Sequence, residues 1–179
     1  MKTSDETLAA AAAAGDADAF RALLERHYDR IFRLAFRLTG ARAEAEDVTQ
    51  DICAALPARL NSFSARSRFT TWLYRVTVNA AHDRRRRQAS LERASHGWGD
   101  WELERRAGAA ETGNRIDWLT EAMRALPDDL RDTLALVLDD MKHAEAARVL
   151  GVSEGTVSWR VSEARKRLRA LRAAEEVDQ

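Results

Sequence analysis

The stretch HAEAARVLGVSEGTVSWRVSEARKRLR, residues 143–169, has the pattern that decides the fold of this chain. It predicts a short helix, a tight turn at Gly151 and a second helix that begins after Ser153, a favourable N-cap residue. The small residues Ala146 and Ala147 would let the two helices cross closely. Together these features are typical of a helix-turn-helix. The alternative is an ordinary amphipathic hairpin with a solvated basic face, but the turn, the cap, the alanine pair and the charge agree on the first interpretation.

The second helix of this motif divides into a packing face and a polar face. Three valines would fill the angle between the helices: Val152, Val157 and Val161. Side chains near a helix N-terminus can reach base edges in a major groove. The polar face carries Glu154, Ser158, Trp159, Ser162 and Arg165. Hydroxyl and basic side chains also bind phosphates, and the candidates here are Thr156, Arg160, Arg165 and Lys166. Trp159 is ambiguous, since an indole could contact a thymine methyl or a sugar, or pack against the neighbouring helix.

Helical periodicity recurs on the N-terminal side of this motif. Asp16 is a plausible N-cap and Gly40 a stop signal for the first predicted helix, and Pro57 marks the approximate end of the second. The predicted helices cover about residues 17–38, 41–58, 69–87, 114–126, 127–138, 143–150 and 154–172. Between Gln88 and Gly113 the periodicity is lost and glycines accumulate, which predicts a flexible linker.

The fold class that follows is all-α. We expect two small helical domains, residues 1–88 and 114–175, joined by a flexible linker at 89–113, with the helix-turn-helix in the C-terminal one. Trp98 and Trp101 are unusual in a free linker and suggest that it docks on its own domains or on a partner.

Charge is distributed unevenly along a chain whose formal net charge is zero. Residues 66–87 carry seven arginines against one aspartate, and residues 154–172 carry six basic side chains against two glutamates. Residues 41–56 have one arginine against four acidic side chains. Hydrophobic residues make up 45% and charged residues 32% of the 179 positions, a composition that suits a soluble helical protein.

Several classes of protein fit the sequence poorly. Cys53 is the single cysteine, so an internal disulfide is excluded. No apolar run approaches the roughly 20 residues needed to span a bilayer, and the N-terminus lacks a basic n-region. We therefore expect a cytoplasmic protein with no membrane insertion. The four histidines are widely spaced and there is no glycine-rich phosphate loop, so we expect no catalytic residues, no metal and no cofactor.

Two further stretches combine groups that bind other molecules. In FTTWLYRVTVNAAHDRRRR, residues 69–87, the aromatics Phe69, Trp72 and Tyr74 could stack on unpaired bases while arginines follow a phosphate backbone. From this stretch alone, a core role for Phe69 and Trp72 with a solvated basic end is an equal alternative. The acidic stretch EAEDVTQDI, residues 44–52, taken alone is typical of a plain surface helix.

In combination these stretches resemble the extracytoplasmic-function group of the sigma-70 family. The resemblance rests on the order and spacing of five segments and covers nearly the whole chain apart from the first dozen residues and the linker. The segments are RHYDRIFRLAFRLTG at 26–40, AEAEDVTQDIC at 43–53, FTTWLYRVTVNAAHDRRRR at 69–87, ALPDDLRDTLALVL at 125–138 and AARVLGVSEGTVSWRVSEARKRL at 146–168.

The resemblance implies a role for each segment. Asp47 and Gln50, with Asp51 beside them, match the helix that docks on the clamp-helix coiled coil of the largest subunit of core RNA polymerase. The loop Asn61–Arg68 and the helix after it match the part that captures flipped bases of the −10 promoter element. The residues expected to contact the −10 element are Ser64, Arg66, Arg68, Phe69, Trp72, Asn79, Arg84 and Arg85.

The C-terminal motif matches the recognition helix for the −35 element. The residues expected there are Ser153, Glu154, Thr156, Ser158, Trp159, Arg160, Ser162, Arg165 and Lys166. The linker matches the segment threaded toward the active centre and the RNA-exit path. The implied function is promoter-specific transcription initiation, with core RNA polymerase and promoter DNA as partners and control by an anti-sigma factor as a further implication.

The sequence departs from the family pattern at two places. Ser158 and Trp159 follow the Gly-Thr-Val where many relatives have a basic and then a small residue, and His143 replaces the usual small polar residue before the scaffold helix. These departures leave the −35 sequence open.

Two other functions are alternatives to this one. A helix-turn-helix regulator that acts without polymerase would explain residues 143–169 but leave 41–87 without a role, and no obvious dimer helix is present. A sigma mimic that titrates an anti-sigma factor would need no DNA-binding charge, whereas the basic stretches 66–87 and 154–172 supply it.

Overall fold

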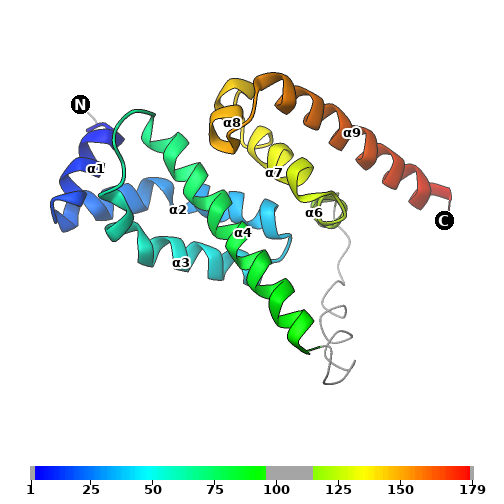
Figure 1. Ribbon diagram of the computed structural model, residues 1–179, viewed down its shortest axis with the longest axis horizontal. Helices are drawn as coiled ribbons and strands as arrows, with labels where there is room; N and C mark the ends of the chain where they lie inside the picture. Colours follow the sequence, from blue (N-terminus) through cyan, green and yellow to red (C-terminus); the bar gives the residue numbers. More distant parts are fainter. Residues whose placement is uncertain (1–2, 96–114, 178–179) are drawn as a thin grey trace.

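A computed structural model describes residues 3–95 and 115–177, and every regular element in those ranges is a helix. The helices are α1 (Asp5–Ala13), α2 (Ala17–Thr39), α3 (Arg42–Leu60), α4 (Phe69–Ser95), α6 (Arg115–Arg124), α7 (Asp128–Val137), α8 (His143–Leu150) and α9 (Glu154–Val177). Helices α1 to α4 form one group, and α6 to α9 form a second group that packs against α2 and α4 (Figure 1). The all-α prediction is confirmed.

Local capping explains most of the helix boundaries. The Asp16 side chain accepts hydrogen bonds from the backbone N–H groups of Asp18 and Ala19 at 2.9 and 3.0 Å, which starts α2 as predicted. Gly40 ends α2 in the left-handed conformation, at φ 73°, and Gly151 ends α8 at φ 68°. The Ser153 hydroxyl accepts from the backbone N–H of Thr156 at 3.0 Å and so caps α9.

The helices differ from the prediction in several places, and α9 continues past residue 172 to Val177. Helix α4 continues past Arg87 to Ser95, because its last turns lack helix breakers even though their apolar periodicity is lost. Helix α3 continues through Pro57 to Leu60, a residue that the core buries almost completely. Helix α1 was not anticipated at all. The segment that includes Trp98 and Trp101 lies outside the described residues.

The first group of helices has its own hydrophobic core. It forms where α1, α2, α3 and α4 meet, and its larger buried members are Leu23, Ile31, Val48, Ile52, Leu56, Leu60, Phe69 and Leu73. Burying one such side chain contributes roughly 1.5–3 kcal/mol relative to leaving it in water. This core fixes the relative positions of α3 and α4, the two helices that carry predicted binding residues.

A second core is shared between the two groups. Its members from α2 and α4 are Leu34, Leu38, Tyr74, Val78 and Ala81. Its members from the C-terminal helices include Met123, Leu126, Leu130, Leu134, Leu136, Val149 and Val157. In this structure the C-terminal group therefore packs directly on α2 and α4.

Candidate nucleic-acid interface

Helices α8 and α9 form the predicted helix-turn-helix around a tightly packed angle. Val157 and Val161 of α9 are buried, as are Ala146 and Ala147 of α8, and Val152 is partly buried in the turn. Small side chains at the crossing let the helices approach closely. A hydrogen bond of 2.9 Å between His143 Nδ1 and Ser158 Oγ adds a polar link between α8 and α9.

The polar face of α9 is exposed to solvent. Its exposed members are Ser153, Glu154, Ser158, Trp159, Ser162, Arg165 and Lys166. Trp159 is 61% exposed, which excludes packing in the core among the alternatives for this side chain. An exposed tryptophan on the second helix of such a motif is positioned for contact with another molecule.

Two predicted phosphate ligands on α9 already have partners within the protein. The Arg160 guanidinium lies 3.3 Å from the carboxylate of Asp129 on α7, and only 20% of its side chain is exposed. The Thr156 hydroxyl is hydrogen-bonded to Ser153 Oγ at 2.8 Å. Of the predicted phosphate ligands, Arg165 and Lys166 are therefore the more available.

An aromatic cluster lies beneath the predicted base-capturing loop. Phe63 of that loop lies 5.5 Å from Phe69 and 5.6 Å from Trp72, measured between ring centroids. Phe69 is only 1% exposed, so its ring belongs to the core and offers no face to a base. Trp72 is half-buried, whereas Ser64, Arg66 and Arg68 around them are exposed.

The basic side chains of α4 make specific ion pairs. Arg84 lies 2.6 Å from the carboxylate of Asp47 on α3. This ion pair links the surface predicted to contact the −10 element with the surface predicted to contact core polymerase. Arg85 lies 3.0 Å from Asp132 on α7. Asn79 is exposed on the same helix. Both arginines are thus paired with carboxylates in this structure.

The α3 surface has the separation of faces that docking requires. Asp47, Gln50 and Asp51 are exposed, while Val48 and Ile52 point into the core. The helix therefore presents an acidic and amide surface without disturbing its packing.

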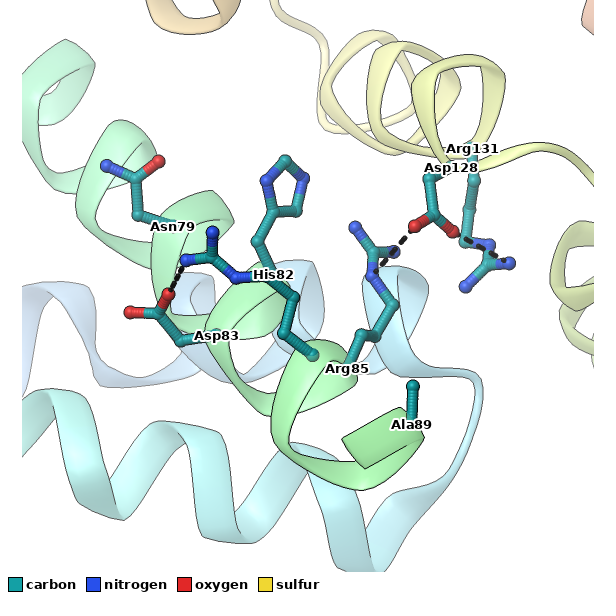
Figure 2. A pocket seen from close by; sticks show the side chains of 8 residues that line it. Asn79, His82, Asp83, Arg85, Ala89, Asp128 and Arg131 are labelled. Carbon is teal, nitrogen blue, oxygen red and sulfur yellow. Dashed lines mark hydrogen bonds and ion pairs between the residues drawn. The ribbon is translucent and has the colours of Figure 1, made fainter. Parts of the chain in front are cut away.

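An open cavity of about 800 Å³ separates α4 from α7. Its lining is polar and comes from both groups of helices, with Asn79, His82, Asp83 and Arg85 on one side and Asp128 and Arg131 on the other (Figure 2). Arg131 donates hydrogen bonds to the backbone carbonyls of Met123, Arg124 and Leu126, at the end of α6. Since its arginines are held by protein groups, the cavity is best described as a gap at the junction of the two groups.

Two carboxylates of the C-terminal group were missed by the sequence analysis. Asp132 is 2% exposed and accepts hydrogen bonds from His82 and Arg85 of α4. Asp139 accepts hydrogen bonds from Tyr74 and from Arg37. Asp132 lies within the apolar pattern of residues 125–138, and Asp139 directly follows it. An acidic residue in an apolar pattern indicates a buried carboxylate with a partner, and this signal could have identified both.

The Tyr74–Asp139 contact changes the ionisation of both groups. Burial raises the pKa of Tyr74, and the hydrogen bond to Asp139 raises it further. Burial also acts to raise the pKa of Asp139, but the hydrogen bonds from Tyr74 and Arg37 outweigh it and hold that pKa below its ordinary value. The pair therefore consists of a neutral phenol that donates to an ionised carboxylate.

Among residues 3–95 and 115–177, no cluster of three histidine, cysteine or acidic side chains could hold a metal ion. Within the same ranges, no helix is long and apolar enough to cross a membrane.

Comparison with known proteins gives matches along most of the chain. The family model of sigma-70 region 2 matches residues 23–91, and that of sigma-70 region 4 matches residues 116–168. The ECF RNA polymerase sigma factor SigM of Mycobacterium tuberculosis is 37% identical over 177 residues, which cover 94% of this chain and 84% of SigM. The ECF RNA polymerase sigma factor SigW of Bacillus subtilis is 29% identical, with 87% of this chain and 89% of SigW covered.

Solved structures give the same result for the fold. The structure of CnrH in complex with the cytosolic domain of CnrY has a TM-score of 0.69 and 29% sequence identity, and the match covers 95% of this chain and 97% of CnrH. The sigma factor RpoE of Bartonella quintana, solved in complex with the anti-sigma factor NepR, has a TM-score of 0.70 at 24% identity. That match covers 89% of this chain and 98% of RpoE and supports the fold alone.

Proposed function

This chain belongs to the extracytoplasmic-function group of the sigma-70 family, and from that membership we propose how it directs core RNA polymerase to promoters. We assign residues 1–88 to core polymerase and the −10 element, residues 114–175 to the −35 element, and residues 89–113 to the connection between them. The observation that carries the proposal is the exposed polar face of α9, which the packed angle with α8 leaves free for a major groove.

At the −35 element, α9 enters the major groove with its N-terminal half. Ser158 and Trp159 read base edges, while Arg165 and Lys166 hold phosphates. Arg160 plays a smaller part in phosphate binding than its charge suggests, because Asp129 partly neutralises it. The hydrogen bond between His143 and Ser158 fixes the position of the Ser158 hydroxyl on this face.

At the −10 element, the loop Asn61–Arg68 captures unpaired bases while α4 follows the backbone. The exposed side chains Ser64, Arg66 and Arg68 supply the polar contacts, and the half-buried Trp72 supplies a flat surface. Phe69 supports this surface from the core. Asn79, Arg84 and Arg85 continue the contact along α4 once the arginines leave their carboxylate partners.

Core polymerase binds the exposed face of α3 through Asp47, Gln50 and Asp51. The polymerase supplies the chemistry of RNA synthesis, and this chain acts in the cytoplasm without a catalytic site of its own. An anti-sigma factor is a further partner. The CnrH structure, which contains the cytosolic domain of CnrY, supports that assignment.

Transcription in vitro with purified core polymerase tests the proposal directly. Core polymerase mixed with this chain should produce transcripts from a promoter selected by the chain, and core polymerase alone should not. A regulator that acts without polymerase would bind DNA but give no transcripts with core. A sigma mimic would bind neither DNA nor core yet would bind an anti-sigma factor.

A further inference from the structure

Helix α1 lies outside the matched family regions but is firmly attached to the N-terminal group. The region 2 match begins at residue 23, and α1 ends at Ala13. The helix packs against α2, α3 and α4, and Ala9 is 1% exposed in their common core. Its first turn is capped by Ser4, whose hydroxyl accepts from the backbone N–H of Thr7 at 3.2 Å.

The first turn of α1 reaches the first turn of α4, far away in the sequence. Glu6 Oε1 accepts a hydrogen bond of 3.1 Å from the backbone N–H of Phe69, the residue at which α4 begins. The first N–H groups of a helix have no partner within the helix and carry a partial positive charge. Arg68, the residue before α4, has a side chain that cannot accept a hydrogen bond. Glu6 therefore supplies a cap that the local sequence does not.

The neighbouring carboxylate holds the other side of the same site. Asp5 Oδ2 is hydrogen-bonded to Nε2 of the buried His27 at 2.9 Å, and Asp5 Oδ1 accepts from Arg26 at 3.0 Å. The His27 ring lies 5.3 Å from the ring of Phe69. The consecutive residues Asp5 and Glu6 thus hold two parts of one site. Glu6 binds the backbone of Phe69, and Asp5 binds the His27 ring that packs against Phe69.

Phe69 in turn supports the loop before α4. Phe63 stands edge-on to Phe69 and also contacts Trp72, so the loop is attached to the core through this aromatic cluster. Ala65 in the same loop has φ 54°, a conformation that costs an L-residue free energy and persists only where surrounding contacts enforce it. The hydrogen bond to Glu6 also lowers the pKa of that carboxyl, so Glu6 is ionised when it caps α4.

We propose that α1 is a brace for the base-capturing loop, with Glu6 as a positioning residue for −10 recognition. This inference rests on the proposed function of the loop Asn61–Arg68. Glu6 acts through Phe69 and the aromatic cluster and does not contact DNA. Without its cap, the first turn of α4 frays and the loop populates arrangements that do not receive the flipped bases.

The test uses the full chain with the variants Glu6→Ala and Glu6→Gln, and Glu25→Ala as a matched control. Glu25 is an exposed carboxylate on α2 in the same group of helices. Three quantities are measured for each: affinity for core polymerase, affinity for a −35 duplex, and promoter opening by the holoenzyme, followed with a fluorescent base in the −10 element. Hydrogen exchange of the first turn of α4 is measured beside them.

Glu6→Ala should lower promoter opening about five- to tenfold, the effect expected for loss of an N-cap, while core and −35 affinities stay unchanged. Glu6→Gln should recover most of the opening, because its amide oxygen can still accept from Phe69. Opening at the level of the Glu25→Ala control in both variants would overturn the proposal. An equal loss in all three quantities, with no recovery by Glu6→Gln, would show that Glu6 only stabilises the fold in general. That result would also overturn the proposal.

Failure of the proposed function is distinguishable from these outcomes. In that case the unaltered chain itself would not open promoters with core polymerase. Faster hydrogen exchange at Phe69 in Glu6→Ala, with no change in Glu25→Ala, would support the structural brace independently of that result.

Discussion

At the scale of single residues, Trp159 best separates recognition from stability. A buried tryptophan replaced by alanine costs about 3–5 kcal/mol, whereas a substitution at an exposed site usually changes stability by less than about 0.5 kcal/mol. With most of its side chain exposed on α9, Trp159 belongs to the second class.

We expect Trp159→Ala to leave the melting temperature nearly unchanged and to alter the preferred −35 sequence. The contrasting variant is Val157→Ala, which removes two methyl groups from a fully buried site two positions away and should lower the melting temperature without altering the preference. Thermal melting and selection from a randomised −35 duplex give the two measurements. A folded Trp159→Ala protein that selects the same sites as the unaltered protein would contradict the assigned reading face.

Tyr74 and Asp139 give a second residue-scale prediction, on pH. The lowered pKa of Asp139 means that its stabilisation is present above the ordinary value of 3.8 and is lost as the pH falls through the folded-state value. The raised pKa of Tyr74 means that its stabilisation is present below the ordinary value of 10.0 and is lost as the pH rises through the folded-state value. The contact therefore contributes fully across the neutral range.

Tyr74→Phe should lower the free energy of unfolding by about 1–2 kcal/mol at neutral pH, because a buried carboxylate loses one of its donors. The same variant should unfold with less dependence on alkaline pH than the unaltered protein. Urea unfolding across the pH range measures both effects. A matched control is Tyr28→Phe, which removes a hydroxyl from an exposed tyrosine on α2. Equal pH profiles for Tyr74→Phe and the unaltered protein would contradict the assigned hydrogen bond.

At the scale of helices, the sequence predicted elements whose ends are fixed by their own residues. Asp16, Gly40, Gly151 and Ser153 act within a few positions along the chain, so local patterns were sufficient to place them. Helix α1 and the last turns of α4 were missed because neither has strong apolar periodicity. The cap at Glu6 and the carboxylates Asp132 and Asp139 depend on partners distant in sequence, which no local pattern contains.

Helix α3 supplies the element-scale prediction, which concerns polymerase docking. Asp47 and Gln50 lie three positions apart on its exposed face, so changing both to alanine removes charge and hydrogen bonding without disturbing the core. We expect affinity for core polymerase to fall at least about tenfold, or about 1.4 kcal/mol. Binding to a −35 duplex should be unaffected. Glu46→Ala is the control, since this carboxylate on the same helix is paired with Arg42. Equal core affinity for the double variant and the control would remove the docking role from this face.

At the scale of the whole molecule, the packed arrangement conflicts with binding at both promoter elements at once. Elements named for positions −10 and −35 are about 25 base pairs apart, which corresponds to roughly 85 Å along B-DNA at 3.4 Å per base pair. Two groups of helices packed on a shared core do not span that distance, so under the proposed assignment this interface opens when both elements are bound. Its polar contacts include the ion pair of 3.0 Å between Arg85 and Asp132, and Figure 2 shows that Arg85 is also paired with Asp128 across the cavity.

Removing Asp132 should therefore favour the open arrangement. In the packed state this carboxylate satisfies His82 and Arg85, and taking away one partner of a buried ion pair typically costs about 3–5 kcal/mol. The cost applies to the packed state alone, because Arg85 and His82 are solvated once the groups separate.

We expect Asp132→Ala to increase the radius of gyration of the free protein in small-angle X-ray scattering. It should also bind single-stranded −10 DNA more tightly in the absence of polymerase, since Arg85 becomes available. Glu121→Ala removes the same charge from an exposed pair within α6 and controls for net charge. If Asp132→Ala matches this control in both size and DNA affinity, the Asp132 contacts do not restrain the two groups.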